Sequence, residues 1–116
     1  MLYKGRIKNF EETSIRDWNF EGIRRDFILI DDEGKEQEIT IFIGYEFFDI
    51  DRFSPDEIED FKKEGYEVEE DVVVIPRITV LWEGVVDYED DAPTIDEVID
   101  KAKKHYPEIP ADLFEL

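Results

Sequence analysis

The sequence predicts an α+β domain over residues 1–116: a largely antiparallel β-sheet with two amphipathic helices packed on one face, in the order β-β-β-α-β-(β)-α. Three observations favour this class. Isoleucine and valine outnumber leucine by 23 to 5, and β-branched side chains favour strands. Alternating apolar patterns fill the first part of the chain, and two helix-capping motifs follow later. Strands that run together before helices appear usually form an antiparallel sheet.

The first strand is expected at Leu2–Phe10, where charged residues alternate with apolar ones. The following stretch, 11–19, is polar and is expected to be a loop. Trp18 and Phe20 are expected to anchor that loop to the core.

A β-hairpin is the clearest local prediction. Strands are expected at 22–30 and 38–45, around a turn at 31–35 in which Gly34 can adopt a positive φ. Alternation in the second strand places three isoleucines on one face: Ile39, Ile41 and Ile43.

Two capping boxes mark the helices. Ser54-Pro55-Asp56-Glu57 predicts a helix start, and the helix should end near Gly65 with Ile58 and Phe61 inward. Thr94-Ile95-Asp96-Glu97 predicts a second start, for a helix that ends before Pro107. Apolar residues at helical spacing define its inner face: Ile95, Val98, Ile99 and Ala102.

The segments around the second helix complete the fold. A strand is expected at 71–82, and Pro76 within it predicts a bulge, an edge or a division into two shorter strands. An acidic loop is expected at 87–92, and one helical turn at 111–114 ends the chain.

Net charge is the most unusual property of the chain. It carries 33 acids against 14 bases, a net charge of −19 and a pI near 4.2. Residues 1–30 sum to +1 and residues 31–116 to −20. This charge disfavours direct binding of nucleic acid or of anionic membranes. Leu, Ile, Val and Phe make up 37 of 116 residues, well above the roughly 20% typical of disordered chains.

No catalytic, metal or cofactor site is expected. The chain has no cysteine and one histidine, His105, so transition-metal sites and thiol chemistry are disfavoured. Ser54 is explained as a helix cap, and the pair Asp49 and Asp51 is explained as solvated surface. The absence of cysteine fits a reducing compartment, and a cytoplasmic location is expected. No signal peptide or membrane-spanning run is expected.

We expect the protein to work by binding rather than by catalysis. The leading hypothesis is an inhibitor or immunity-type protein that occupies the basic surface of a partner, such as a nuclease, by electrostatic steering. The first alternative is a nucleic-acid mimic of the anti-restriction or anti-CRISPR kind. The second is a structural or regulatory domain whose acidity has no specific role.

Two acidic clusters are the expected contact sites for this partner. Each contains a tyrosine that is expected to be exposed and to act as an anchor. The first cluster is Asp87, Tyr88, Glu89, Asp90 and Asp91. The second cluster is Tyr66, Glu67, Glu69, Glu70 and Asp71.

Overall fold

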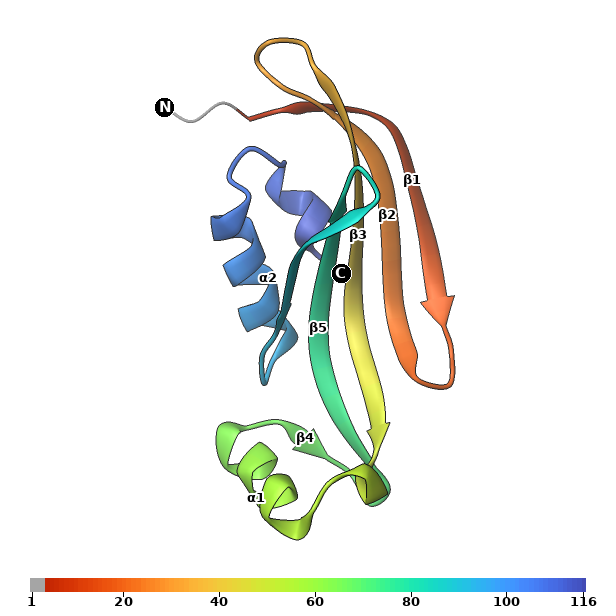
Figure 1. Ribbon diagram of the computed structural model, residues 1–116, viewed down its shortest axis with the longest axis vertical. Helices are drawn as coiled ribbons and strands as arrows, with labels where there is room; N and C mark the ends of the chain where they lie inside the picture. Colours follow the sequence, from red (N-terminus) through yellow and green to blue (C-terminus); the bar gives the residue numbers. More distant parts are fainter. Residues whose placement is uncertain (1–3) are drawn as a thin grey trace.

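The computed structural model describes residues 4–116, so Leu2 and Tyr3 of the predicted first strand lie outside the described residues. The predicted α+β class is confirmed by one six-stranded antiparallel sheet and two helices (Figure 1). The sheet order is β1-β2-β3-β5-β4, and β6 also pairs with β5. The strands are β1 (Arg6–Arg16), β2 (Phe20–Ile30), β3 (Glu36–Asp49), β4 (Glu67–Val68), β5 (Val72–Trp82) and β6 (Val85–Asp91). The helices are α1 (Pro55–Glu64) and α2 (Ile95–His105), with 3₁₀ turns η1 (Ile50–Arg52) and η2 (Ala111–Phe114).

Strand β1 continues through the stretch that was predicted to be a loop. Residues 11–16 pair with β2, after a register shift at which Asn9 has a φ of 57°. These residues are largely exposed, so neither face of the ribbon carries the apolar signal that marks a strand. The predicted anchoring role of Trp18 is wrong, since this side chain is 86% exposed at the β1–β2 turn.

The predicted hairpin between β2 and β3 is confirmed. One Asp31 carboxylate oxygen accepts hydrogen bonds from the backbone amides of Glu33 and Lys35, at 3.0 and 2.8 Å. Gly34 supplies the expected positive φ, 82°. The three isoleucines of β3 are buried, as the alternation indicated: Ile39, Ile41 and Ile43.

Strand β5 runs unbroken through Pro76, so a division into two strands is wrong, and Pro76 lies instead at a local edge of the sheet. On the side of β5 away from β3, β4 pairs with residues 73–74 and β6 pairs with residues 77–82. Neither strand pairs with Pro76, so the ladder of backbone hydrogen bonds is interrupted there. The Pro76 carbonyl faces this interruption and accepts a 3.4 Å hydrogen bond from the Ala92 amide. The nitrogen and carbonyl of one residue point to the same side of a strand, so the missing N–H costs no bond to β3.

The predicted acidic loop at 87–92 is also wrong, because Val85–Asp91 form the edge strand β6. The turn that returns the chain is Glu83-Gly84, and both residues have positive φ values, 52° and 80°. Two positive φ values define the tight hairpin turn whose twist matches that of the flanking strands. Aspartate and glutamate have low strand propensity, so the sequence of β6 does not indicate a strand.

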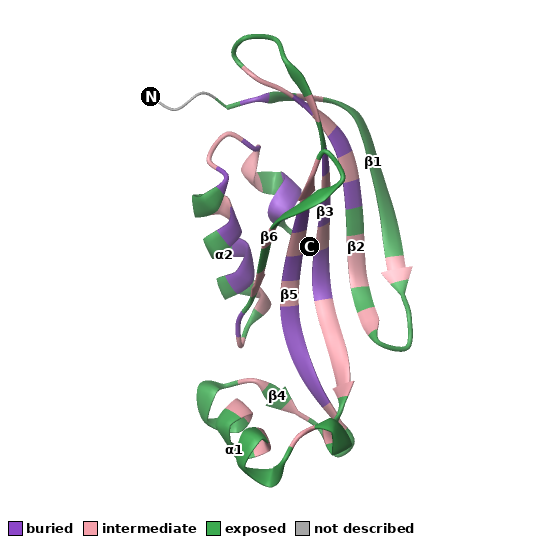
Figure 2. Ribbon diagram, in the orientation of Figure 1, coloured by how far each residue is buried: buried purple, intermediate pink, exposed green. Residues whose placement is uncertain are grey.

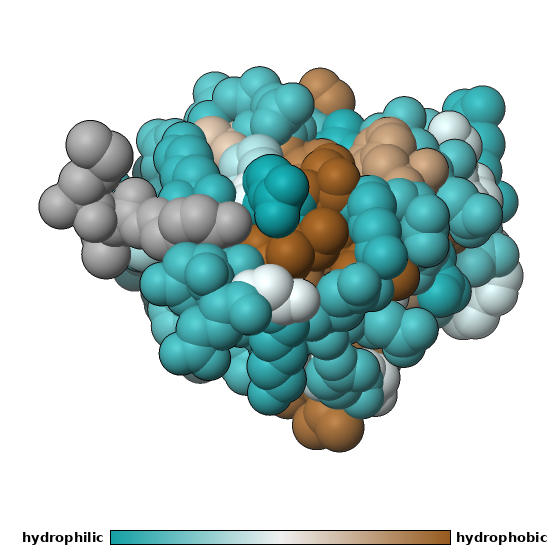
Figure 3. Space-filling view, turned by 90° about the horizontal axis from the view of Figure 1, so that it is seen from above, coloured by the Kyte–Doolittle hydropathy of each residue, from teal (hydrophilic) through white to brown (hydrophobic). Residues whose placement is uncertain are grey.

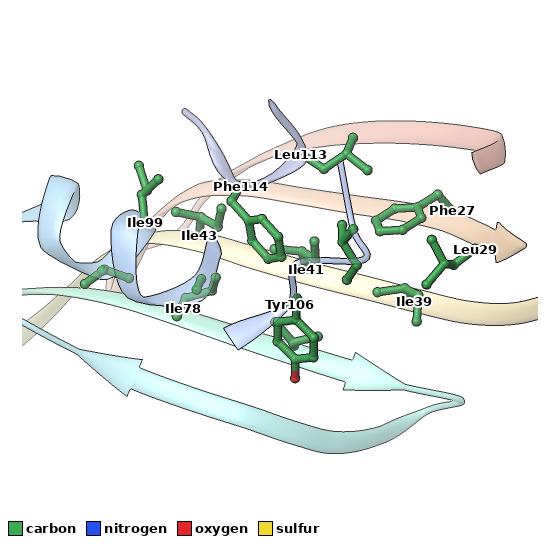
Figure 4. Packing of buried hydrophobic residues seen from close by; sticks show 14 of the residues in the cluster. Phe27, Leu29, Ile39, Ile41, Ile43, Ile78, Ile99, Tyr106, Leu113 and Phe114 are labelled. Atoms are coloured by element: carbon green, nitrogen blue, oxygen red, sulfur yellow. The ribbon is translucent and has the colours of Figure 1, made fainter. Parts of the chain in front are cut away.

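The core lies between the sheet and the C-terminal part of the chain (Figure 4). Phe114 is fully buried and stacks on Tyr106, with ring centroids 6.0 Å apart. The buried Arg25 side chain donates to the Leu113 carbonyl at 2.8 Å and to the Glu12 carboxylate at 2.7 Å. The terminal turn η2 is therefore part of the core.

Both helices begin at the predicted N-cap residue, and the full capping box is present at α1. The Ser54 hydroxyl accepts from the Glu57 amide, and the Glu57 carboxylate accepts from the Ser54 amide, at 3.2 and 3.0 Å. Gly65, at a φ of 95°, ends α1. The Thr94 hydroxyl accepts from the amide of Glu97 at the start of α2.

The two helices contribute differently to burial. Helix α2 buries Val98, Ile99 and Ala102, whereas α1 buries no residue (Figure 2). The Phe61 ring of α1 contacts the Phe53 ring, with centroids 5.0 Å apart. The Phe53 ring in turn contacts the Phe48 ring of β3, with centroids 6.2 Å apart. Phe48 lies five residues from Ile43 along β3, and this odd spacing places it on the opposite sheet face. These ring contacts tie α1 to the end of β3, whereas α2 packs on the core cluster.

The molecule is elongated, with extents of 52 × 29 × 21 Å. Helix α1, β4 and η1 lie at one end of the long axis, and the β2–β3 turn lies at the other (Figure 1). Seen from above, apolar side chains gather in the middle of the upper end, with hydrophilic residues around them (Figure 3). The surface is therefore not uniformly charged, and its two ends can differ in chemistry.

Candidate functional site

The acids of the first predicted cluster, on β6, all have partners. The hydroxyl of Tyr106 donates to Asp87, and that of Tyr66 donates to Asp91 at 3.0 Å. Asp90 forms an ion pair with Lys101 at 3.4 Å, and Glu89 with Arg77 at 3.6 Å. These carboxylates hold the edge strand to its neighbours, and two of the four, Glu89 and Asp90, are paired with a base.

The two tyrosines that were expected to be exposed are both half-buried. The Tyr88 ring stacks on His105, with centroids 4.4 Å apart, and its hydroxyl lies 3.3 Å from Asp90. Burial, followed by the hydrogen bond to Asp91, raises the pKa of Tyr66 to about 12. Burial also raises the pKa of Tyr88. Each ring is thus part of the packing, and Tyr66 links the two predicted clusters through Asp91.

The acids of the second cluster differ from those of β6 in exposure and in pairing. Glu67, Glu69, Glu70 and Asp71 are all exposed, and no ion pair to a base is found for them in the described chain. A hydrogen bond with Glu67, and repulsion from Glu67 and Asp71, raise the pKa of the Glu69 carboxyl. The carboxylates at this point crowd one another.

Sequence reasoning missed the acids that the fold adds to this cluster. The Ile50 amide donates to the Asp71 carbonyl at 2.9 Å, which places the η1 turn against the 67–71 segment. An open hollow of about 730 Å³ lies there, lined by Asp49, Ile50, Asp51, Glu70 and Asp71. Helix α1 adds further exposed acids: Asp56, Glu57, Glu59, Asp60 and Glu64.

We call residues 49–71 the acidic lobe. It holds 11 acids and three bases, and every one of the acids is exposed. Within this fully described segment, one ion pair is found, between Lys62 and Glu59 at 3.6 Å. The lobe therefore presents a concentrated negative surface at one end of the long axis (Figure 1). A count of acids in a sliding window could have shown this enrichment, but not the contact between 49–51 and 71.

The remaining expectations concern metals and membranes. In residues 4–116, no group of three or more His, Cys, Asp or Glu side chains is arranged to hold a metal ion. His105 packs against Tyr88 and Tyr106. Over the same range, no helix has the length and apolar character needed to cross a bilayer. Comparison of the chain with protein-family models, curated protein sequences and solved structures finds no match.

Proposed function

We propose that the protein is an acidic binding protein whose acidic lobe occupies the basic surface of another protein and so blocks it. The observation that supports this is the contrast between the two acidic clusters. The carboxylates of β6 are bound to groups of the same chain. The 11 carboxylates of the acidic lobe are exposed, with one ion pair among them.

Electrostatics gives this arrangement a direct use. Like charges held close together destabilise the fold that holds them. The Glu67–Glu69 contact shows this crowding, because it disfavours ionisation of Glu69. A partner that brings lysine and arginine to the lobe relieves this repulsion, and the same field steers the partner toward it. Both effects weaken with salt, since the screening length falls from about 10 Å at 0.1 M to about 3 Å at 1 M.

The lobe is tested against a matched site at the other end of the molecule. The lobe double variant is Glu69→Gln with Glu70→Gln, and the hairpin double variant is Asp32→Asn with Glu33→Gln. Each removes two exposed charges from a connecting segment, so net charge changes equally. Wild type and both variants are immobilised and incubated with extract of the source organism. Bound proteins are eluted in steps from about 50 to 500 mM salt and identified by mass spectrometry.

The expected result is a basic protein that wild type and the hairpin double variant retain alike. The lobe double variant should release it at a lower salt step. Equal release from both variants would show that net charge, not the lobe, governs binding. Retention of no basic protein at low salt would refute the proposal.

The captured partner also separates the two kinds of blocking. A toxin or hydrolase that loses activity on binding corresponds to an immunity-type inhibitor. A nucleic-acid-binding enzyme that DNA displaces from the lobe corresponds to a nucleic-acid mimic.

A further inference from the structure

An apolar groove lies beside the acidic lobe. It has a volume of about 430 Å³, within the range of about 300–1,000 Å³ typical of ligand sites. Its apolar lining comes from three separate parts of the chain: Tyr45, Phe47, Val74, Pro76, Pro93 and Ile95. Val74 and Pro76 form a buried floor, and the other four are half-buried.

The groove is the open continuation of the core face of the sheet. Tyr45 and Phe47 lie two and four residues beyond Ile43 in β3, so they share its face. The core cluster includes Ile43 but neither Tyr45 nor Phe47. Apolar side chains of the sheet are therefore left at the surface between α2 and the lobe.

The surroundings of the groove are acidic. Glu67 of the acidic lobe lines it directly, and Asp96 follows Ile95 in the first turn of α2. None of the described lining residues is a lysine or arginine. An occupant that matches this site is apolar at its centre and cationic at its edges.

We propose that the groove receives one apolar side chain from a segment of the partner protein, with lysines or arginines on either side of it. This inference rests on the proposed function and gives the complex a contact that salt does not screen. Burial of an apolar side chain in the groove slows dissociation, whereas the exposed carboxylates mainly speed association.

The test uses two peptide probes of equal charge, Lys-Lys-Leu-Lys-Lys and Lys-Lys-Gly-Lys-Lys. Each is titrated into the ¹⁵N-labelled full-length protein, and amide chemical shifts are followed by NMR. The leucine peptide should bind about tenfold more tightly, which is less than full burial of a leucine would give. Its additional shifts should centre on Val74 and Thr94, which line the groove outside the acidic lobe.

A matched pair of variants isolates the groove. Phe47 and Phe42 are both half-buried in β3 but lie on opposite faces of the sheet. Phe42 lies under the guanidinium of Arg24 instead, with the Cζ atom 5.4 Å from the ring centroid. Phe47→Ala should remove the preference for the leucine peptide, and Phe42→Ala should keep it. If either variant does not fold, the amide shifts of the wild-type protein with the two peptides test the groove instead.

Equal affinity for both peptides, with shifts confined to the acidic lobe, would overturn the groove proposal and leave the proposed function standing. Binding of neither peptide would contradict both. Concentration-dependent shifts of the groove amides without peptide would overturn the groove proposal in favour of a second copy of the chain.

Discussion

The fully buried side chain of Phe114 should be among the most costly to remove. It lies in the 3₁₀ turn η2, two residues before the last residue of the sequence, Leu116. Removing a buried phenylalanine costs about 3–5 kcal/mol. A domain of this length has a free energy of unfolding of about 6–17 kcal/mol. Phe114→Ala should therefore remove between a fifth and most of the stability.

The assay is equilibrium denaturation by urea, followed by circular dichroism and by tryptophan fluorescence. Coincident transitions by the two probes justify a two-state analysis. Trp18→Ala is the matched control, because this larger aromatic is 86% exposed and should change stability by no more than about 0.5 kcal/mol. The reasoning would be refuted if Phe114→Ala cost under about 1 kcal/mol, or if both variants cost the same.

Three further perturbations follow from the same contacts. The pKa of Tyr66 is raised from 10.0 to about 12, so its contribution to stability is present below pH 10 and is lost as the pH rises through about 12. Tyr66→Phe should reduce that loss in urea midpoints measured across this window, and an unchanged slope would contradict the raised pKa of Tyr66. Glu69→Gln should raise the melting temperature at low salt, since the raised pKa of Glu69 reflects crowding with Glu67. The gain should shrink in 1 M salt, and a gain that persists would contradict the electrostatic origin. Gly22→Ala should cost about 1–3 kcal/mol in the same urea assay, because a Cβ there would lie 2.2 Å from a β3 carbonyl oxygen; a neutral effect would contradict the close approach of the strands.

The local signals in the sequence were sufficient for much of the fold. Ser54 and Gly65 bound α1 as their capping chemistry predicts, and the Asp31 turn closes the β2–β3 hairpin. The strands that the sequence did not predict lack the periodic pattern of apolar residues that marks a strand. Residues 11–16 of β1 are polar on both faces, and β6 is largely acidic. Both are strands because a neighbouring strand supplies the pairing, which a single segment does not reveal.

The candidate site shows the same limit. The acids at 67–71 and those of β6 look alike in sequence, yet the latter hydrogen bond to tyrosines or pair with Lys101 and Arg77. The contribution of Asp49 and Asp51 depends on the hydrogen bond from the Ile50 amide to Asp71, between positions 21 residues apart. Net charge can be counted in a sequence, but the distinction between offset and free carboxylates requires the fold.

The central claim is that the acidic lobe, and not net charge, recognises a basic partner. The most direct measurement is the association rate of the captured partner with wild type, the lobe double variant and the hairpin double variant, at about 50 and 500 mM salt. We predict that the lobe double variant associates severalfold more slowly at low salt, that the hairpin double variant matches wild type, and that the three rates converge at high salt. Equal slowing of both variants, or rates that do not depend on salt, would contradict the claim.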